Sequence, residues 1–156
     1  MTSHALRHQA RLPIPRPDVG IAGIVCIGGL VLLGVGALAG GIALVAAPDG
    51  SAMHFSTALL AGSPFPDYLV PGLILGGLFG VGSLVVAAMG LRRHRLAPFL
   101  AFGIGTGQMI WIVVELAIID ELSFLHPVMF IVGVMIAASA VPWGRPTLIA
   151  WRSRAA

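Results

Sequence analysis

Glu115 stands out because it is an ionisable side chain well inside a long apolar stretch. It ends the run Trp111-Ile112-Val113-Val114-Glu115, and Gln108 lies seven residues before it. At about 3.6 residues per turn, Gln108, Trp111 and Glu115 share one stripe of a helix. Ionisable groups inside a membrane are costly and are commonly functional. The stripe predicts an intramembrane polar site for a proton or a cation, with Gln108 as second partner.

The same stripe also has a purely structural interpretation. Glu115 lies about one turn from the end of its apolar stretch, where a carboxylate stays hydrated and costs less than at mid-bilayer. There it can simply accept a hydrogen bond from a neighbouring helix. The sequence leaves both interpretations open.

A second polar group is expected on the outer face of the protein. It comprises Asp120, Glu121 and His126, together with His54 and Asp67 from a separate loop. Carboxylates and imidazoles are metal ligands, but no two of these residues have the spacing of ligands on one helix. We therefore expect solvated polar caps, with no metal and no other cofactor. The chain also lacks nucleotide-binding, nucleophile and metalloprotease motifs, which predicts that it is not an enzyme.

The elements that position these side chains follow from composition. The chain is 58% hydrophobic and 10% charged, which excludes both a soluble domain and a disordered one. A helix needs about 20 apolar residues to cross a bilayer. Four stretches come close to that length: residues 19–47, 70–91, 97–119 and 124–141. The predicted fold is an all-α membrane protein, a four-transmembrane-helix bundle over residues 19–143.

The basic residues indicate the orientation of this bundle. All nine are arginines, in three clusters: Arg7, Arg11 and Arg16; Arg92, Arg93 and Arg95; Arg145, Arg152 and Arg154. Four crossings place all three clusters on one side, which the positive-inside rule makes the cytoplasm. This spacing between apolar stretches also argues against a nucleic-acid partner.

Both termini are therefore expected in the cytoplasm, and the absence of lysine favours a bacterial gene and its inner membrane. Residues 1–18 carry alternating prolines and are predicted to be a disordered cytoplasmic segment. Residues 144–156 are predicted to be a basic cytoplasmic tail. Aromatic rings at Tyr68 and Trp143 are expected at the two membrane borders. Segment 51–60 of the outer loop is either a short interfacial helix or an irregular loop.

Small residues are expected at the helix contacts, because lipid tails are as apolar as leucine and hydrophobicity alone cannot hold the helices together. Each predicted helix carries small residues four positions apart. They are Gly36 and Gly40; Gly72, Gly76 and Gly80; Gly103 and Gly107; and Gly133 with Ala137. These contacts can lie within one chain or between two copies.

Two segments resemble a family of small bacterial four-helix integral membrane proteins with no assigned activity. The first runs from Ala61 to Leu75 and contains Gly62-Ser63-Pro64-Phe65, Tyr68 and Pro71-Gly72. The second combines Trp111-Ile112 and Glu115 with Ser123-Phe124-Leu125-His126-Pro127. The resemblance covers about residues 19–143. It implies the four-helix topology and makes the outer proline turn the feature that defines the group.

Three functions fit the sequence. Small size and few polar residues favour a non-enzymatic accessory or scaffold component, whose partners are the lipid bilayer and another membrane protein or a second copy. The alternative is a small proton- or cation-coupled transporter that uses Glu115. A third is an enzyme that acts on lipid at the outer face through Asp67, Glu115 or His126.

Overall fold

The computed structural model describes residues 18–118 and 124–155, and over these residues the secondary structure is entirely helical. Four helices are long and apolar enough to cross a membrane: Ile21–Ala46, Leu69–Leu91, Ala97–Ile118 and Leu125–Ile149. The fold of the described chain is thus that expected of a multi-pass membrane protein. Asp120, Glu121 and Ser123 lie outside the described residues, as do residues 1–17.

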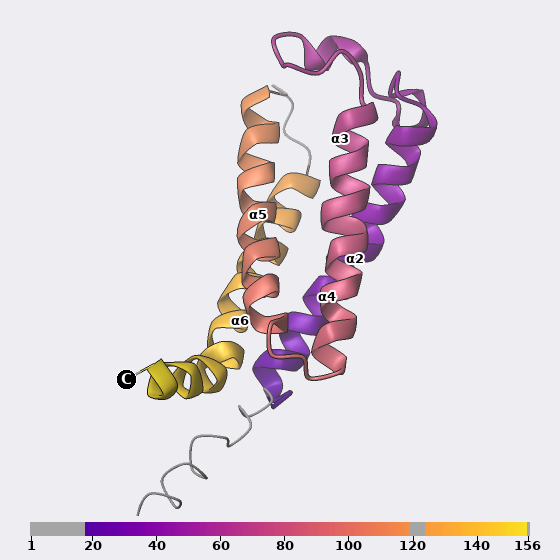
Figure 1. Ribbon diagram of the computed structural model, residues 1–156. Coiled ribbons are helices and arrows are strands. Elements are labelled where there is room, and N and C mark those ends of the chain that lie inside the picture. The colour runs from indigo at the N-terminus through magenta and orange to yellow at the C-terminus, as the bar shows by residue number, and fades with distance from the viewer. Residues whose placement is uncertain (1–17, 119–123, 156) are drawn as a thin grey trace, which may run out of the picture.

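The first span is α2 (Ile21–Ala46), which begins after Gly20 and ends just before Pro48. Its side chains are apolar on all sides, as expected for a helix that contacts both lipid and protein. The second span is continuous but changes its hydrogen-bonding pattern along its length. It consists of α3 (Leu69–Leu73), the π-helix η3 (Ile74–Val81) and α4 (Gly82–Leu91). Figure 1 shows these three elements as one rod beside α2.

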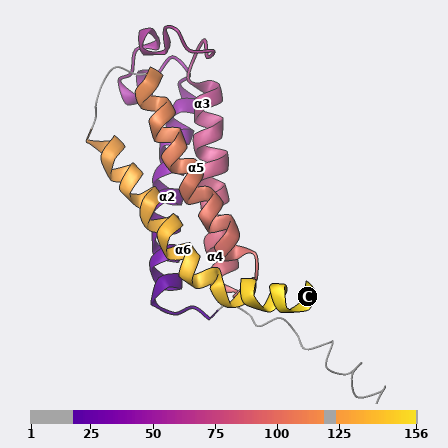
Figure 2. The same cartoon turned by 90° about the vertical axis from the view of Figure 1, so that its left-hand side faces the viewer.

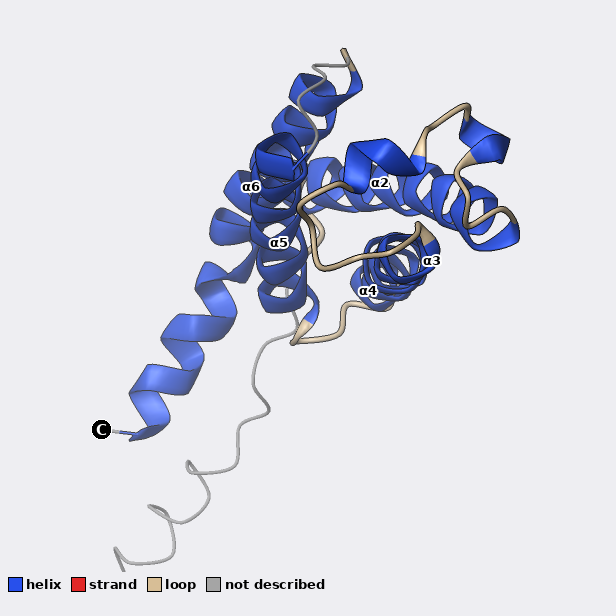
Figure 3. Ribbon diagram, turned by 90° about the horizontal axis from the view of Figure 1, so that it is seen from above, coloured by secondary structure: helices blue, strands red, loops and turns tan. Residues whose placement is uncertain are grey.

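The four spans form a closed ring of neighbours. The first span, α2, packs against the α3–η3–α4 rod and against α6 (Leu125–Ala155), while α5 (Ala97–Ile118) packs against α4 and α6. Seen from above, α2 runs across the view while the α3–η3–α4 rod is seen end-on (Figure 3). The core between them is apolar and well buried, with contributions from Leu30, Leu33, Phe79, Ala101 and Ile136.

The last helix, α6, is longer than its apolar stretch. The sequence places its end near residue 141, whereas the structure continues the helix to Ala155 through Pro142 and Pro146. Proline removes a backbone hydrogen bond and bends a helix. Figures 1 and 2 show the C-terminal part of α6 turned away from the bundle axis. Residues 144–155, expected to be a tail, are therefore a helical extension.

The connection between α2 and α3, named the outer connection after the side that the sequence predicts for it, contains two short 3₁₀ helices, η1 (Ser51–Met53) and η2 (Thr57–Leu60). They replace both the single helix and the irregular loop that the sequence left open. His54 breaks the segment between them because its backbone is left-handed, with φ of 59°. This connection lies at one end of the bundle, and the α4–α5 turn and both ends of the described chain lie at the other (Figure 1).

Candidate functional site

The structure brings together two polar residues that the sequence placed in different groups. Glu115 lies at the outer end of α5 and His126 in the first turn of α6. His126 Nε2 is 4.0 Å from Glu115 Oε2, and the two side chains are 13% and 32% exposed respectively. A protonated imidazole beside a carboxylate forms an ion pair, while a neutral one does not. The pair therefore brings an acidic and a basic side chain together where the end of α5 meets the start of α6.

Gln108 lies two turns deeper on α5 and faces the opposite helix. Its side chain is 2% exposed, and its Oε1 has no hydrogen-bond partner among the described residues. A Cβ built on Gly133 of α6 would lie 3.4 Å from Gln108 Cβ, which places Gln108 in the α5–α6 contact. The partner that the structure gives Glu115 is His126 rather than Gln108.

Trp111, the third member of the stripe, faces the second span. Its ring lies 5.9 Å from the ring of Phe79 in η3, tilted by 55°. Tilted aromatic pairs at this separation are favourable. Trp111 thus contributes packing between α5 and η3. The three residues of the stripe therefore contact two different neighbours of α5: Trp111 contacts η3, and Gln108 and Glu115 contact α6.

Of the other outer-face candidates, Asp67 and His54 have separate surroundings in the described chain, while Asp120 and Glu121 lie outside it. Asp67 Oδ1 accepts a hydrogen bond at 2.9 Å from the backbone N–H of Leu69, the first residue of α3. His54 is exposed in the turn between η1 and η2. Over residues 18–118 and 124–155, no group of three or more histidine, cysteine or acidic residues is arranged to hold a metal ion.

The outer connection is organised around Tyr68, which the sequence placed at the membrane border. The ring is buried against Leu44 and Leu60 and lies 5.9 Å from the ring of Phe55. Tyr68 Oη donates a hydrogen bond to Ser56 O at 2.8 Å, and Tyr68 N donates one to Pro48 O at 2.8 Å. Burial raises the pKa of the Tyr68 phenol above its usual value. Tyr68 is thus the core of a folded outer cap, residues 48–68.

The first turn of the outer cap depends on Asp49, Gly50 and Ser51. Asp49 Oδ1 accepts hydrogen bonds from Ser51 Oγ at 2.7 Å and from Ser51 N at 3.1 Å. These bonds, the hydroxyl first, hold the pKa of Asp49 below its usual value. Gly50 has φ of 83°, and a Cβ there would lie 2.9 Å from the Tyr68 ring. Only glycine fits this position without strain.

Glycines of the second span provide its contact with α2. A Cβ on Gly72 would lie 2.8 Å from Leu44 Cβ, and one on Gly80 would lie 2.9 Å from Leu38 Cα. On α2, however, the closest approach is at Gly41, where a Cβ would overlap the backbone of Gly76. Gly36, which the sequence assigned to packing, has no atom within 4 Å, and Gly40 meets only the end of Leu75. The contact face of α2 is therefore rotated from the expected one.

In the α5–α6 contact, too, the glycine of α5 that makes the contact differs from the glycines that the sequence predicts. A Cβ on Gly105 would lie 2.7 Å from Ala137 N, and one on Gly133 would lie 2.9 Å from Gly105 O. Gly103 has no atom within 4 Å, and Gly107 is 3.6 Å from the Phe79 ring, an ordinary contact. Gly133 and Ala137 thus lie at the helix contact, and their partner on α5 is Gly105.

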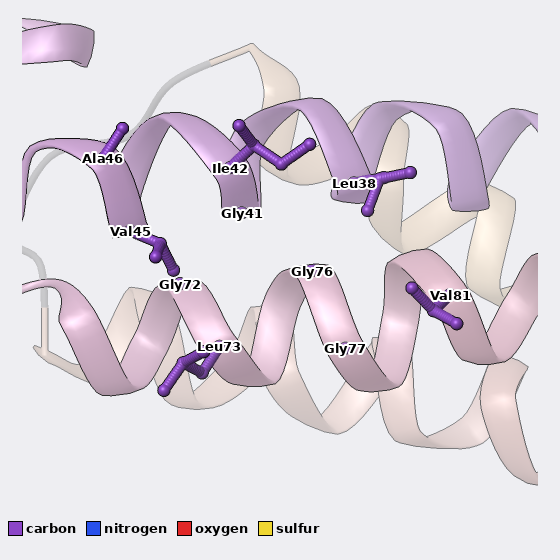
Figure 4. A pocket seen from close by; sticks show the side chains of 10 residues that line it. All are labelled: Leu38, Gly41, Ile42, Val45, Ala46, Gly72, Leu73, Gly76, Gly77 and Val81. Carbon is purple, nitrogen blue, oxygen red and sulfur yellow. The ribbon is translucent and has the colours of Figure 1, made fainter.

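An apolar groove opens on the outside of the bundle between α2 and the α3–η3–α4 rod. Its volume is about 360 Å³. The lining residues are Leu38, Gly41, Ile42, Val45, Ala46, Gly72, Leu73, Gly76, Gly77 and Val81. Figure 4 shows glycines along the line where the two helices approach, with the branched side chains at its rim. The groove is thus an apolar surface shared by two membrane-length helices.

Trp143 lies in a slot that the sequence did not reveal. The indole is buried against Ile27, and a Cβ on Gly23 or Gly90 would lie within 3.1 Å of it. The sequence placed this ring at the membrane border, but the structure places it in the bundle. Glycines on α2 and α4 leave room for the ring, and their distance in sequence from Trp143 explains why no local pattern reveals the slot.

Comparison of the chain with protein-family models, with curated proteins and with solved structures found no significant match.

Proposed function

We propose that the chain is a multi-pass protein of the bacterial inner membrane that serves as a non-enzymatic accessory or scaffold for another membrane component. Both termini and the Arg92–Arg95 turn then face the cytoplasm. Two features support this orientation: the described arginines gather at one end of the bundle, and Asp49 and Asp67 lie in the connection at the other end. Positive charge is retained on the cytoplasmic side of inner-membrane proteins.

The groove between α2 and the α3–η3–α4 rod is the observation that carries the accessory role. Its rim includes the exposed side chains of Ile42, Leu73 and Val81. Membrane helices associate where small residues let another backbone approach closely. Gly77 offers such a place, because a Cβ there would meet no atom within 4 Å. A helix of a partner protein, or of a second copy, fits this chemistry.

Filling the groove tests the proposal. Gly77→Leu places a bulky side chain in the groove, and Gly103→Leu is its matched control, since both glycines have open space and only Gly77 lines the groove. We expect cross-linking in native membranes to recover a membrane protein or a second copy with the wild type and with Gly103→Leu. The Gly77→Leu variant should no longer be cross-linked to that partner.

The same experiment has two outcomes that contradict the accessory role. One is that the wild-type chain is recovered alone and as a monomer. The other is that Gly77→Leu and Gly103→Leu retain the partner equally, which would remove the groove as the contact.

The Glu115–His126 pair favours a second candidate, a proton- or cation-coupled transporter. The pair joins two membrane-length helices, and the unpartnered Oε1 of Gln108 lies deeper on the same α5. Carboxylate and imidazole side chains inside membrane spans are the groups from which proton relays of pumps and transporters are built. Under this candidate, Glu115 is the proton carrier and His126 its partner.

Proton flux in liposomes tests this candidate directly. A potassium gradient with valinomycin drives protons, and a dye inside the vesicles reports their pH. We expect flux with the wild type, none with Glu115→Gln, and normal flux with the control Asp67→Asn, since the Asp67 side chain accepts only a local hydrogen bond from Leu69 N among the described residues. Flux that survives Glu115→Gln rules the transporter out.

A further inference from the structure

The C-terminal extension of α6, residues 144–155, leaves the bundle after the bend at Pro142 and Pro146. In both Figure 1 and Figure 2 it runs at a steep angle to the spans, at the level of the α4–α5 turn. A helix at such an angle to membrane spans has the direction of an amphipathic helix that lies in the membrane interface. The extension therefore has one side toward the bundle and another toward its surroundings.

Burial separates these two sides. Gly144 and Thr147 are buried, and a Cβ on Gly144 would lie 3.2 Å from Pro98 Cβ at the start of α5. The exposed residues Arg145, Leu148, Ile149 and Arg152 follow at spacings of three, one and three, which puts them on one face of a helix. Leu148 is 42% exposed and Ile149 is 67% exposed. This face has an apolar centre with an arginine at each end.

The end of the bundle from which the extension emerges is strongly basic. Arg92, Arg93 and Arg95 occupy the α4–α5 turn, and Arg145 and Arg152 lie on the extension. Of the acidic side chains in the described chain, Asp18 alone lies at this end, where it is 3.3 Å from Arg93. Anionic lipid headgroups attract such a surface. A second copy of the same face would bring arginines against arginines, which repel.

We propose that residues 145–152 lie in the cytoplasmic leaflet and bind anionic phospholipids. Leu148 and Ile149 enter the acyl boundary, while Arg145 and Arg152 extend to the phosphates, as long basic side chains do at membrane interfaces. The assignment to the cytoplasmic leaflet rests on the orientation proposed above. The depth of the helix in the bilayer does not depend on that orientation.

An environment-sensitive fluorophore at residue 149 tests the proposal in the full chain. The probe is attached to Ile149→Cys, or to the control Ala52→Cys in the outer cap, after Cys26→Ala removes the one native cysteine. Nanodiscs that hold one copy each contain either phosphatidylcholine alone or a mixture with phosphatidylglycerol. We expect a blue-shifted emission and several-fold weaker quenching by acrylamide at residue 149 than at residue 52. The shift should increase with phosphatidylglycerol.

The double variant Arg145→Gln/Arg152→Gln tests the charge. Both side chains are exposed, so the variant leaves the bundle core unchanged, and we expect it to abolish the phosphatidylglycerol dependence. Equal quenching at residues 149 and 52 would overturn the proposal. So would a shift that is the same in both lipid compositions, or one that keeps its dependence in the double variant. Cysteine labelling in cells measures the orientation separately. A failure of the proposed orientation is therefore distinguishable from a failure of the lipid-binding proposal.

Discussion

Tyr68 holds the outer cap together through its buried ring and its hydrogen bonds. Its ring fills the space between Leu44 and Leu60, and its hydroxyl and amide fix two separate backbone carbonyls. The cap contains little else that is buried, because most side chains of η1 and η2 are exposed. The order of residues 48–68 therefore depends strongly on this one residue.

Two substitutions of Tyr68 separate its ring from its hydroxyl. Tyr68→Phe keeps the ring and removes one hydrogen bond, which we expect to cost about 1 kcal/mol of unfolding free energy. Tyr68→Ala also removes the ring, which should cost about 3–5 kcal/mol. Unfolding in detergent, followed by circular dichroism and by proteolysis of the cap, measures both. Equal losses would show that the ring contributes nothing.

The ionisation of Tyr68 gives a pH prediction. Because burial raises its pKa, the folded state favours the neutral phenol, and the cap has its full stability below the unfolded pKa of about 10. That stability is lost as the pH rises through the higher folded value. The chain has one tyrosine, so tyrosinate absorbance reports this group alone. We expect a higher midpoint in folded than in denatured protein, and coincident midpoints would contradict the burial.

At the level of residues, sequence reasoning could identify Glu115 because a carboxylate in an apolar stretch is visible from local context. Its pairing with His126 could not be foreseen, since it depends on how α5 and α6 tilt and rotate against each other. Trp143 shows the same limit. Its ring looks like an interfacial aromatic until Gly23 and Gly90, far away in the chain, are seen to make room for it.

At the level of elements, helix positions follow from composition, but helix rotation does not. The faces of α2 are almost equally apolar, so no pattern marks which one contacts the neighbouring helix. Among its many glycines, the structure uses Gly41 at the closest contact and leaves Gly36 open. The continuation of α6 through two prolines was equally hidden, because proline normally argues for a helix end.

Matched alanine substitutions test the rotation of α2. At Gly41 the new methyl group overlaps the backbone of Gly76, and forcing the helices apart should cost about 1–3 kcal/mol. At Gly36 the methyl group enters open space, and better helix propensity should add about 0.5–1 kcal/mol. Unfolding by a denaturing detergent measures both changes.

The pair Gly105→Ala and Gly103→Ala repeats this comparison on α5. The first should destabilise through contact with Ala137 N, and the second should not. If Gly36→Ala destabilises as much as Gly41→Ala, or Gly103→Ala as much as Gly105→Ala, the rotation described for that helix is wrong.

At the level of the whole molecule, the described bundle is polar at its two ends and apolar around its sides. Large exposed apolar side chains occur on every span, among them Ile42, Leu78, Ile110 and Ile131. Such a surface is stable only in lipid or against another protein. The two ends differ, with arginines in the α4–α5 turn and on α6, and acidic residues in the outer cap.

Single cysteines at the two ends test the orientation in cells. With Cys26→Ala as background, we expect a membrane-impermeant maleimide to label Ala52→Cys in intact spheroplasts. It should label His94→Cys only after the membrane is permeabilised. Both positions are exposed, so burial of the cysteine within the protein does not limit the labelling reaction. Labelling of His94→Cys in intact spheroplasts would reverse the topology.

The hydrogen bond from Tyr68 N to Pro48 O brings the two stems of the outer cap together. The residues between those stems form a closed loop that includes Gly62. Gly62 has a φ of 90°, and a Cβ built on it would have no atom within 4 Å. Exposed turns of this kind accept inserted domains. A small folded protein with adjacent termini, grafted after Gly62, would give this compact bundle the rigid external landmark that particle alignment in electron microscopy requires.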